Sequence, residues 1–231
     1  MTIPSVSGGL EVLRYREGRR EYVIGVGYDE DTMEYYAIAP PGIPLRILDY
    51  MVGLKGLYYP PDPTEKNAFL GGTVATNASG SRGFYYGSTR DYIRRLRIVL
   101  ANGEVLEIRR GSHYARGYKF KIIYLNGDEV EVELPKYKMP NVRKNAAGYY
   151  SKPNMDIIDL FIGSEGTLGV FTEIEVKLIK RPKIIIPVYI YFKDYTSSIN
   201  FVKEIRGIPF KKICDSRVIS IEYFDENSVK F

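Results

Sequence analysis

The chain has 231 residues, of which 45% are hydrophobic and 26% are charged, and its formal net charge is +5. This composition is typical of a soluble globular protein with one sizeable core, or with one domain and part of a second. No apolar run reaches the roughly 18 residues of a transmembrane helix, and the single cysteine, Cys214, excludes an internal disulfide. The N-terminus lacks the pattern of a signal peptide, so we expect a cytoplasmic location.

The N-terminal part of the chain predicts two short strands and a helix. The strands are expected at residues 21–26 and 34–39, on either side of a polar turn. Pro44 favours the start of a helix that continues to Met51, because apolar residues recur there near helical spacing.

Two hairpins are predicted next, at residues 94–109 and 119–134. Each has apolar residues that alternate with polar ones and an Asn-Gly pair at its turn, which are the usual signals of a hairpin. Residues 135–150 contain several prolines and lysines, and we expect them to form a loop.

The last third of the chain mixes helices and strands again. We predict a helix at 155–162, a strand at 168–179, a boundary at Arg181-Pro182, a buried strand at 184–192, a helix at 197–205, a strand at 218–223 and a helix N-cap at Asp225. This intermixture predicts an α+β fold.

Two stretches of small residues stand out as a candidate ligand site. The first contains Gly71-Gly72 and runs through Thr76-Asn77-Ala78-Ser79-Gly80, and the second is Gly163-Ser164-Glu165-Gly166-Thr167-Leu168-Gly169-Val170. Small residues let a backbone approach a flat or phosphorylated ligand, and backbone N–H groups of the first stretch would face a diphosphate or the polar edge of a ring. The alternative is that these glycines serve turns and packing only.

Other chemical signals in the sequence are weaker. Gly25-Val26-Gly27 follows a predicted strand, but Glu30 stands where a dinucleotide fingerprint needs its third glycine. His113, the only histidine, could serve as a base or a flavin attachment point, or could simply be solvated, and no metal site is expected. Cys214 follows a basic pair, although a small buried hydrophobe is the favoured interpretation.

Six arginines form a basic cluster around the first hairpin: Arg94, Arg95, Arg97, Arg109, Arg110 and Arg116. Such a cluster could meet nucleic-acid phosphates, but it comes without a basic helix or an aromatic stacking platform. A solvated hairpin face, or a contact with an acidic partner or a cofactor phosphate, is favoured instead.

Several words of the sequence, in the same order, resemble a known family. They are the run PPDPTEKNAFLGGTVATNASGSRGFYYGSTRDYIRRLRIVLANGEVLEIRRG, the word KNAAGYY and the run MDIIDLFIGSEGTLGVFTEIEVKLIKRP. They resemble the FAD-binding oxidoreductases of the vanillyl-alcohol oxidase type, and among these the D-lactate dehydrogenase and glycolate oxidase FAD-subunit group. The resemblance covers about residues 35–182 and continues more weakly through EYFDEN at 222–227.

The resemblance implies an FAD-binding PCMH-type domain that holds FAD non-covalently between two α+β subdomains. The family's cofactor-binding words fall on Asp62, Pro63, Thr64, Gly71, Gly72, Thr76, Asn77, Ala78, Ser79, Gly80, Gly163, Glu165, Gly166, Thr167, Gly169 and Val170. We expect residues 1–182 to be this domain, with its N-terminal subdomain largely missing. Residues 183–231 would be the incomplete start of the α+β cap domain that binds substrate.

The resemblance also implies a function. Complete members would transfer a hydride from a small 2-hydroxy acid, of the D-lactate or glycolate type, to flavin N5. We expect this chain to be inactive alone and to need a complementing chain or an electron-acceptor protein, with no nucleic-acid partner. The alternative is a non-catalytic interaction subunit, or a decayed fragment that does not bind FAD alone.

Overall fold

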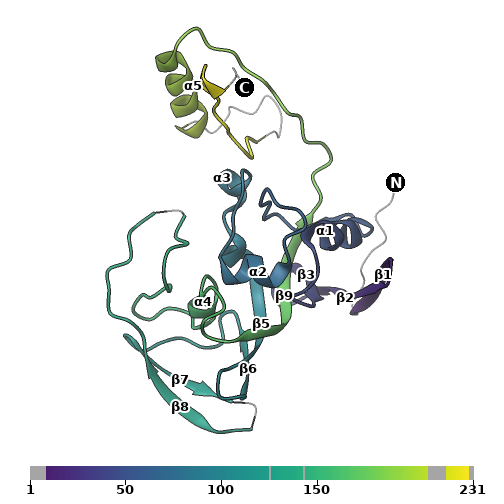
Figure 1. Cartoon of the computed structure of the whole chain (residues 1–231), viewed down its shortest axis with the longest axis vertical. Helices are drawn as coiled ribbons and strands as arrows, with labels where there is room; N and C mark the ends of the chain where they lie inside the picture. Colours follow the sequence, from purple (N-terminus) through teal and green to yellow (C-terminus); the bar gives the residue numbers. More distant parts are fainter. Residues whose placement is uncertain (1–8, 125, 143, 208–216, 229–231) are drawn as a thin grey trace.

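The computed structural model describes residues 9–124, 126–142, 144–207 and 217–228, and it is built around one antiparallel sheet. The strands pair in the order β1-β2-β3-β9-β5-β6, and the short β4 adds to β9 (Figure 1). The strands are β1 (Glu11–Glu17), β2 (Arg20–Asp29), β3 (Glu34–Ala39), β4 (Leu57–Tyr58), β5 (Ile93–Val99), β6 (Val105–Arg109) and β9 (Val170–Lys180). The sheet thus joins the N-terminal strands to β5 and β6 through β9, which comes from far along the chain.

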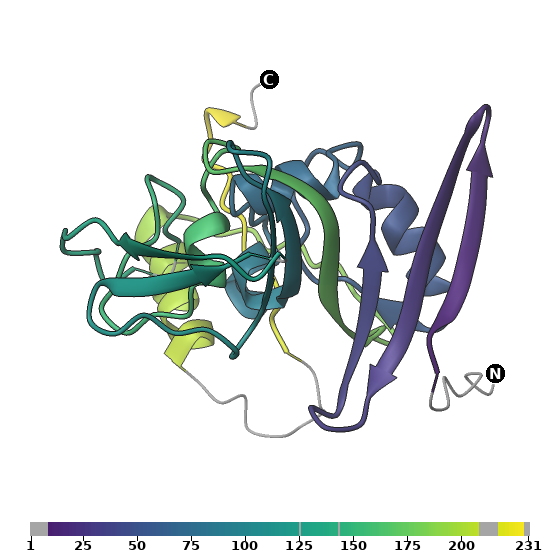
Figure 2. The same cartoon turned by 90° about the horizontal axis from the view of Figure 1, so that it is seen from below.

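The helices of the described part are short. They are α1 (Leu45–Gly53), α2 (Leu70–Ala75), α3 (Gly83–Tyr86), α4 (Ile158–Phe161), α5 (Tyr195–Gly207) and the 3-10 helix η1 (Thr89–Tyr92). A separate two-stranded sheet contains β7 (Lys119–Ile123) and β8 (Glu129–Glu133), and it extends from the main body as a hairpin (Figure 2). The α+β fold class is therefore confirmed, as are both predicted hairpins.

The hydrophobic core lies between one face of the sheet and the helices α1, α2 and α4. It is built from alternate residues of the strands, such as Ile24 in β2, Leu96 in β5 and Val176 in β9, all at most 1% exposed. The apolar stripe of α1, including Leu48, and Val74 of α2 pack against this face. Burial of these side chains is the main force that fixes the helices on the sheet.

The structure adds one strand to the expected secondary structure and shortens one expected helix. Strand β1 was not predicted, although Leu13 and Tyr15 alternate with charged residues in the pattern of a half-buried strand and pack against the core. The helix expected at 155–162 is limited to α4, which has four residues. The first part of that segment instead bonds to the chain around His113 and Ala115.

The expected strands at 184–192 and 218–223 do not form in the described part of the chain. Residues 184–192 are an extended connection between β9 and α5 (Figure 1) and have no backbone partner among the described residues. Their side chains are exposed, and Tyr191 has 93% of its surface in solvent. The apolar, β-branched sequence suits a buried strand, but a strand also needs a neighbour with which to pair.

Candidate site where three segments meet

The two stretches of small residues lie side by side in the structure. The Gly163 N–H donates to the Val74 carbonyl at 3.0 Å, and the Glu165 N–H donates to the Ala75 carbonyl at 2.7 Å. The last turn of α2 is therefore bonded directly to the segment that follows α4. Nearly 90 residues separate the two segments in sequence, so the fold places together what the sequence could only suggest as a pair.

The Pro-Asp-Pro loop joins this arrangement from a third side. A Cβ at Gly80 would collide with the Asp62 carbonyl oxygen, so the loop rests directly on the end of the first stretch. The Asp62 carboxylate pairs with Lys66 and with Arg82 Nε, the latter at 2.9 Å. Because two cations face it, the charge of Asp62 is offset within the chain. Pro63 is half-buried beside it, and Thr64 is exposed.

The glycines of the site fall into two groups. A Cβ at Gly71 would lie 2.7 Å from the Pro41 side chain, and one at Gly169 would lie 2.6 Å from Ile98, so both serve close packing. By contrast, a Cβ at Gly72 or Gly166 would meet nothing within 4 Å. Only the second group leaves open space beside the backbone, which is the space that a bound ligand would use.

The backbone donors of the first stretch differ in part from the expectation. The N–H groups of Gly71, Thr76, Asn77 and Ala78 already donate to carbonyls of this chain, namely those of Pro41, Gly72, Val74 and Thr73. They cannot also face a diphosphate. In the described part of the chain, no acceptor is found for the N–H groups of Gly72, Ser79 and Gly80.

The remaining polar groups of the first stretch form hydrogen bonds that stabilise the conformation of this stretch. Asn77 is 4% exposed, has a φ of +46°, and accepts a hydrogen bond on Oδ1 from the Arg90 N–H at 3.0 Å. Thr76 Oγ1 donates to the Gly72 carbonyl, and the Ala78 carbonyl accepts bonds from the Thr89 N–H and hydroxyl. A small polar residue that tolerates a positive φ is needed at position 77, which explains the asparagine.

The second stretch is the more exposed of the two. Glu165 lies in solvent with a φ of +55°, and Val170 is 67% exposed at the start of β9. The Thr167 hydroxyl lies 2.6 Å from both the Ser164 carbonyl and the Tyr149 hydroxyl. Tyr149 belongs to the KNAAGYY word, so this loop also reaches the site.

Arg90 is a residue of this site that the sequence did not single out. Its side chain lies between α2 and α4, and burial lowers its pKa while the nearby Asp159 carboxylate opposes that effect. No periodic pattern marks it, because it lies in the short η1 turn.

The basic cluster around the first hairpin is corrected by the structure. Arg94 and Arg95 are 7% and 8% exposed, and their partners are carboxylates of this chain rather than solvent or phosphates. Glu175, on β9, bonds to Arg95 Nε at 3.2 Å and to both terminal nitrogens of Arg109 at 3.1 and 3.2 Å. A cavity of about 270 Å³ on the sheet face opposite the core is lined by Asp29, Arg95, Glu107, Arg109 and Glu175, among others.

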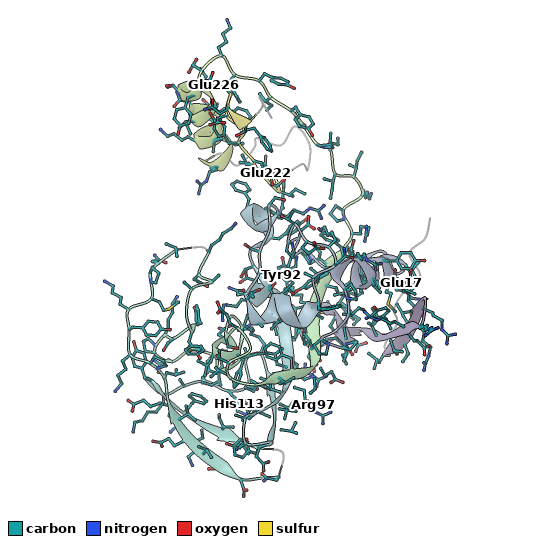
Figure 3. All side chains as sticks on the ribbon, in the orientation of Figure 1. Glu17, Tyr92, Arg97, His113, Glu222 and Glu226 are labelled. Carbon is teal, nitrogen blue, oxygen red and sulfur yellow. The ribbon has the colours of Figure 1, made fainter. Side chains whose placement is uncertain are left out.

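His113 does not contribute to the site as described. His113 is exposed, and its Nδ1 lies 2.6 Å from the hydroxyl of its neighbour Ser112. Figure 3 shows it at the β6 end of the molecule, away from Tyr92, which lies beside α2. Cys214 lies outside the described residues. In the part of the chain that is described, no helix could span a membrane and no cluster of His, Cys, Asp and Glu could hold a metal ion.

Comparison with known proteins gives consistent relatives. Residues 10–109 match the family described as FAD binding domain. D-lactate dehydrogenase of Anaerostipes hadrus is 34% identical over 179 residues, which make up 78% of this chain and 30% of that protein. Glycolate oxidase subunit GlcD of Bacillus subtilis is 36% identical over 67% of this chain and 25% of its own length. The chain thus spans less than a third of these relatives.

A solved structure supports the same fold. Alkyldihydroxyacetonephosphate synthase superposes with a TM-score of 0.51 and 21% identity, over 78% of this chain and 25% of that one. At this identity the likeness concerns the fold alone.

The site fits a flat ligand with an anionic part. It has open space at Gly72 and Gly166, backbone N–H groups nearby that have no acceptor among the described residues, and an Asp62 carboxylate whose charge is offset by two cations.

Proposed function

We propose that this chain is the FAD-binding part of an enzyme that oxidises a small 2-hydroxy acid. The chain belongs to the FAD-linked oxidoreductases of the vanillyl-alcohol oxidase type, and D-lactate dehydrogenase and glycolate oxidase are among its relatives. Its α+β fold is the FAD-binding PCMH-type fold expected from the sequence. The observation that carries the proposal is the meeting of both Gly-rich stretches and the Pro-Asp-Pro loop at one place.

The residues at this place would divide the work of holding FAD. Among the described residues, the N–H groups of Gly72, Ser79 and Gly80 have no acceptor, so they are available to an anionic part of the cofactor. Gly166 leaves room for the approach of its flat part. The other residues of the predicted site would frame it: Asp62, Pro63, Thr64, Gly71, Thr76, Asn77, Ala78, Gly163, Glu165, Thr167, Gly169 and Val170. Binding would be non-covalent, since none of these residues is a His, Cys or Tyr that could form a flavin bond.

The chemistry would be shared with residues outside this set. Bound FAD supplies the hydride acceptor, at N5, for oxidation of the Cα–OH group of the substrate. The residues described here bind and orient, whereas a base is needed to take the hydroxyl proton. Since His113 lies away from the site, we assign the base to a complementing chain. Reoxidation of the reduced cofactor would fall to an electron-acceptor protein. Residues 1–182 would form the FAD-binding domain, 183–231 would begin the cap, and the complex would be cytoplasmic.

The absorption spectrum of the purified chain tests this proposal. The protein is dialysed against FAD, alone and after mixing with polypeptides that carry the flanking segments of Bacillus subtilis GlcD. A retained flavin band in either sample, followed by bleaching when D-lactate or glycolate is added to the mixture, is the expected result. If both samples stay colourless, the FAD-binding role is wrong.

A second function, a non-catalytic interaction subunit, is favoured by one specific observation. Residues 184–192 expose a run of large apolar side chains, including Ile186 at 68% and Tyr189 at 81%, which suits a surface that another protein covers. The two functions differ in the spectrum: a subunit of this kind would associate with a partner while it remains colourless in FAD.

A further inference from the structure

We propose that Arg90 is a positioning residue that fixes the two Gly-rich stretches against each other. The inference rests on the proposed function as far as FAD is concerned, but its structural part does not depend on the cofactor. Arg90 lies in η1, which follows the first stretch after the short helix α3, and its side chain is only 10% exposed. It contacts the first stretch, the residue that directly precedes the second stretch, and the loop that covers them.

The contacts of Arg90 join segments that are far apart in sequence. Its backbone N–H donates to Asn77 Oδ1 at 3.0 Å, which ties it to the first stretch. Its guanidinium donates from Nη2 to the Ile162 carbonyl and from Nη1 to the Asp159 carbonyl, both at 2.5 Å. Ile162 is followed directly by Gly163, where the second stretch begins. The two ends of one residue therefore hold the two walls of the site.

A third segment closes over the guanidinium. Its Cζ lies 4.2 Å from the centroid of the Tyr150 ring, a distance that allows a cation–π contact. Tyr149, the neighbouring residue, bonds to the Thr167 hydroxyl of the second stretch. The KNAAGYY loop is thus anchored on Arg90 at one residue and on the second stretch at the next.

The geometry requires an arginine rather than any cation. A planar fork can donate to two carbonyls in fixed directions, whereas an ammonium is a point charge on a flexible stem. The cost of burying this charge is not fully offset, since Arg90 Nε has no hydrogen-bond partner in the described part of the chain. A buried ionic group of this kind adds little net stability to a protein. We therefore explain Arg90 by the arrangement of the two stretches that it specifies.

The test uses the full chain with Arg90→Lys and follows backbone hydrogen exchange at Gly163 and Glu165. These two N–H groups bond to the last turn of α2, so their exchange reports directly when α2 separates from the segment after α4. We expect exchange at both to rise about tenfold or more, while the midpoint of urea unfolding changes little. Flavin affinity should fall by a similar factor. Arg97→Lys, on the exposed side of β5, is the matched control and should change none of these values.

The outcomes separate the inference from the proposed function. Unchanged exchange at Gly163 and Glu165 in the Arg90→Lys variant would overturn the inference, whether or not FAD binds. If the unsubstituted chain takes up no FAD, even with the flanking segments, the proposed function fails, and the exchange data still decide the role of Arg90. Should Arg90→Lys not fold, Asn77→Gly keeps the positive φ and removes the Oδ1 acceptor, and it should also speed exchange at both groups. Normal protection in this variant would count equally against the role.

Discussion

At the scale of single residues, a buried charge network centred on Glu175 links three strands of the sheet. This carboxylate is 3% exposed and lies within 3.5 Å of guanidinium nitrogens of Arg94, Arg95 and Arg109. It connects β9 to β5 and β6 on the sheet face that no core residue covers. The arginines look like a basic surface in the sequence because their acidic partner is 66 to 81 residues away.

Loss of the Glu175 charge should therefore be costly. In Glu175→Gln, the buried Arg94 and Arg95 lose one counter-charge but keep Asp29 and Glu107. We expect the free energy of unfolding to fall by about 1–3 kcal/mol. The matched control is Glu173→Gln, two residues earlier on the same strand and 37% exposed, which should cost at most about 1 kcal/mol. Urea unfolding of the three proteins gives the comparison, and equal values for the two variants would contradict the role assigned to Glu175.

At the scale of elements, local sequence signals predicted the structure where each element could be recognised from its own residues. Both hairpins carry Asn-Gly turns, and α1 has a clear apolar stripe, so these formed as expected. The candidate site could not be recognised from local signals in this way. The contact between α2 and the segment after α4 depends on the chain as a whole, and the role of Arg90 depends on that contact. The small residues and the resemblance to a family suggested that these segments form a pair, but neither indicated which N–H groups remain without an acceptor.

The α2 helix offers a prediction in which stability and binding move in opposite directions. Gly72 lies inside this helix with open space at its Cβ position, so Gly72→Ala should raise the free energy of unfolding by about 0.5–1 kcal/mol. The same methyl group would block the approach of a cofactor, and FAD uptake should fall at least severalfold. In Gly71→Ala the new Cβ meets Pro41, so that variant should lose both stability and binding. A Gly72→Ala protein with unchanged FAD affinity would show that the cofactor does not approach this turn.

At the scale of the whole molecule, the described chain has two very unlike parts. The sheet and its helices bury a continuous core, whereas the connection at 184–192 leaves its apolar side chains in solvent. A sequence pattern identifies such a run as a strand, but whether it is buried depends on what lies next to it. The relatives, of which this chain spans less than a third, contain much additional sequence that could provide such a neighbour.

This exposed run predicts how the isolated protein behaves. An apolar segment of this length with unpaired backbone groups favours association between copies, so we expect the purified chain to bind a hydrophobic dye and to form oligomers as its concentration rises. Replacement of Ile186, Val188 and Ile190 by Lys should reduce both effects and leave the midpoint of unfolding unchanged, because none of the three packs on the core. Light scattering and dye fluorescence on the two proteins make the comparison. If the unsubstituted chain is a monodisperse monomer that binds no dye, residues 184–192 are already covered within the chain, and there is no need for a second protein at this surface.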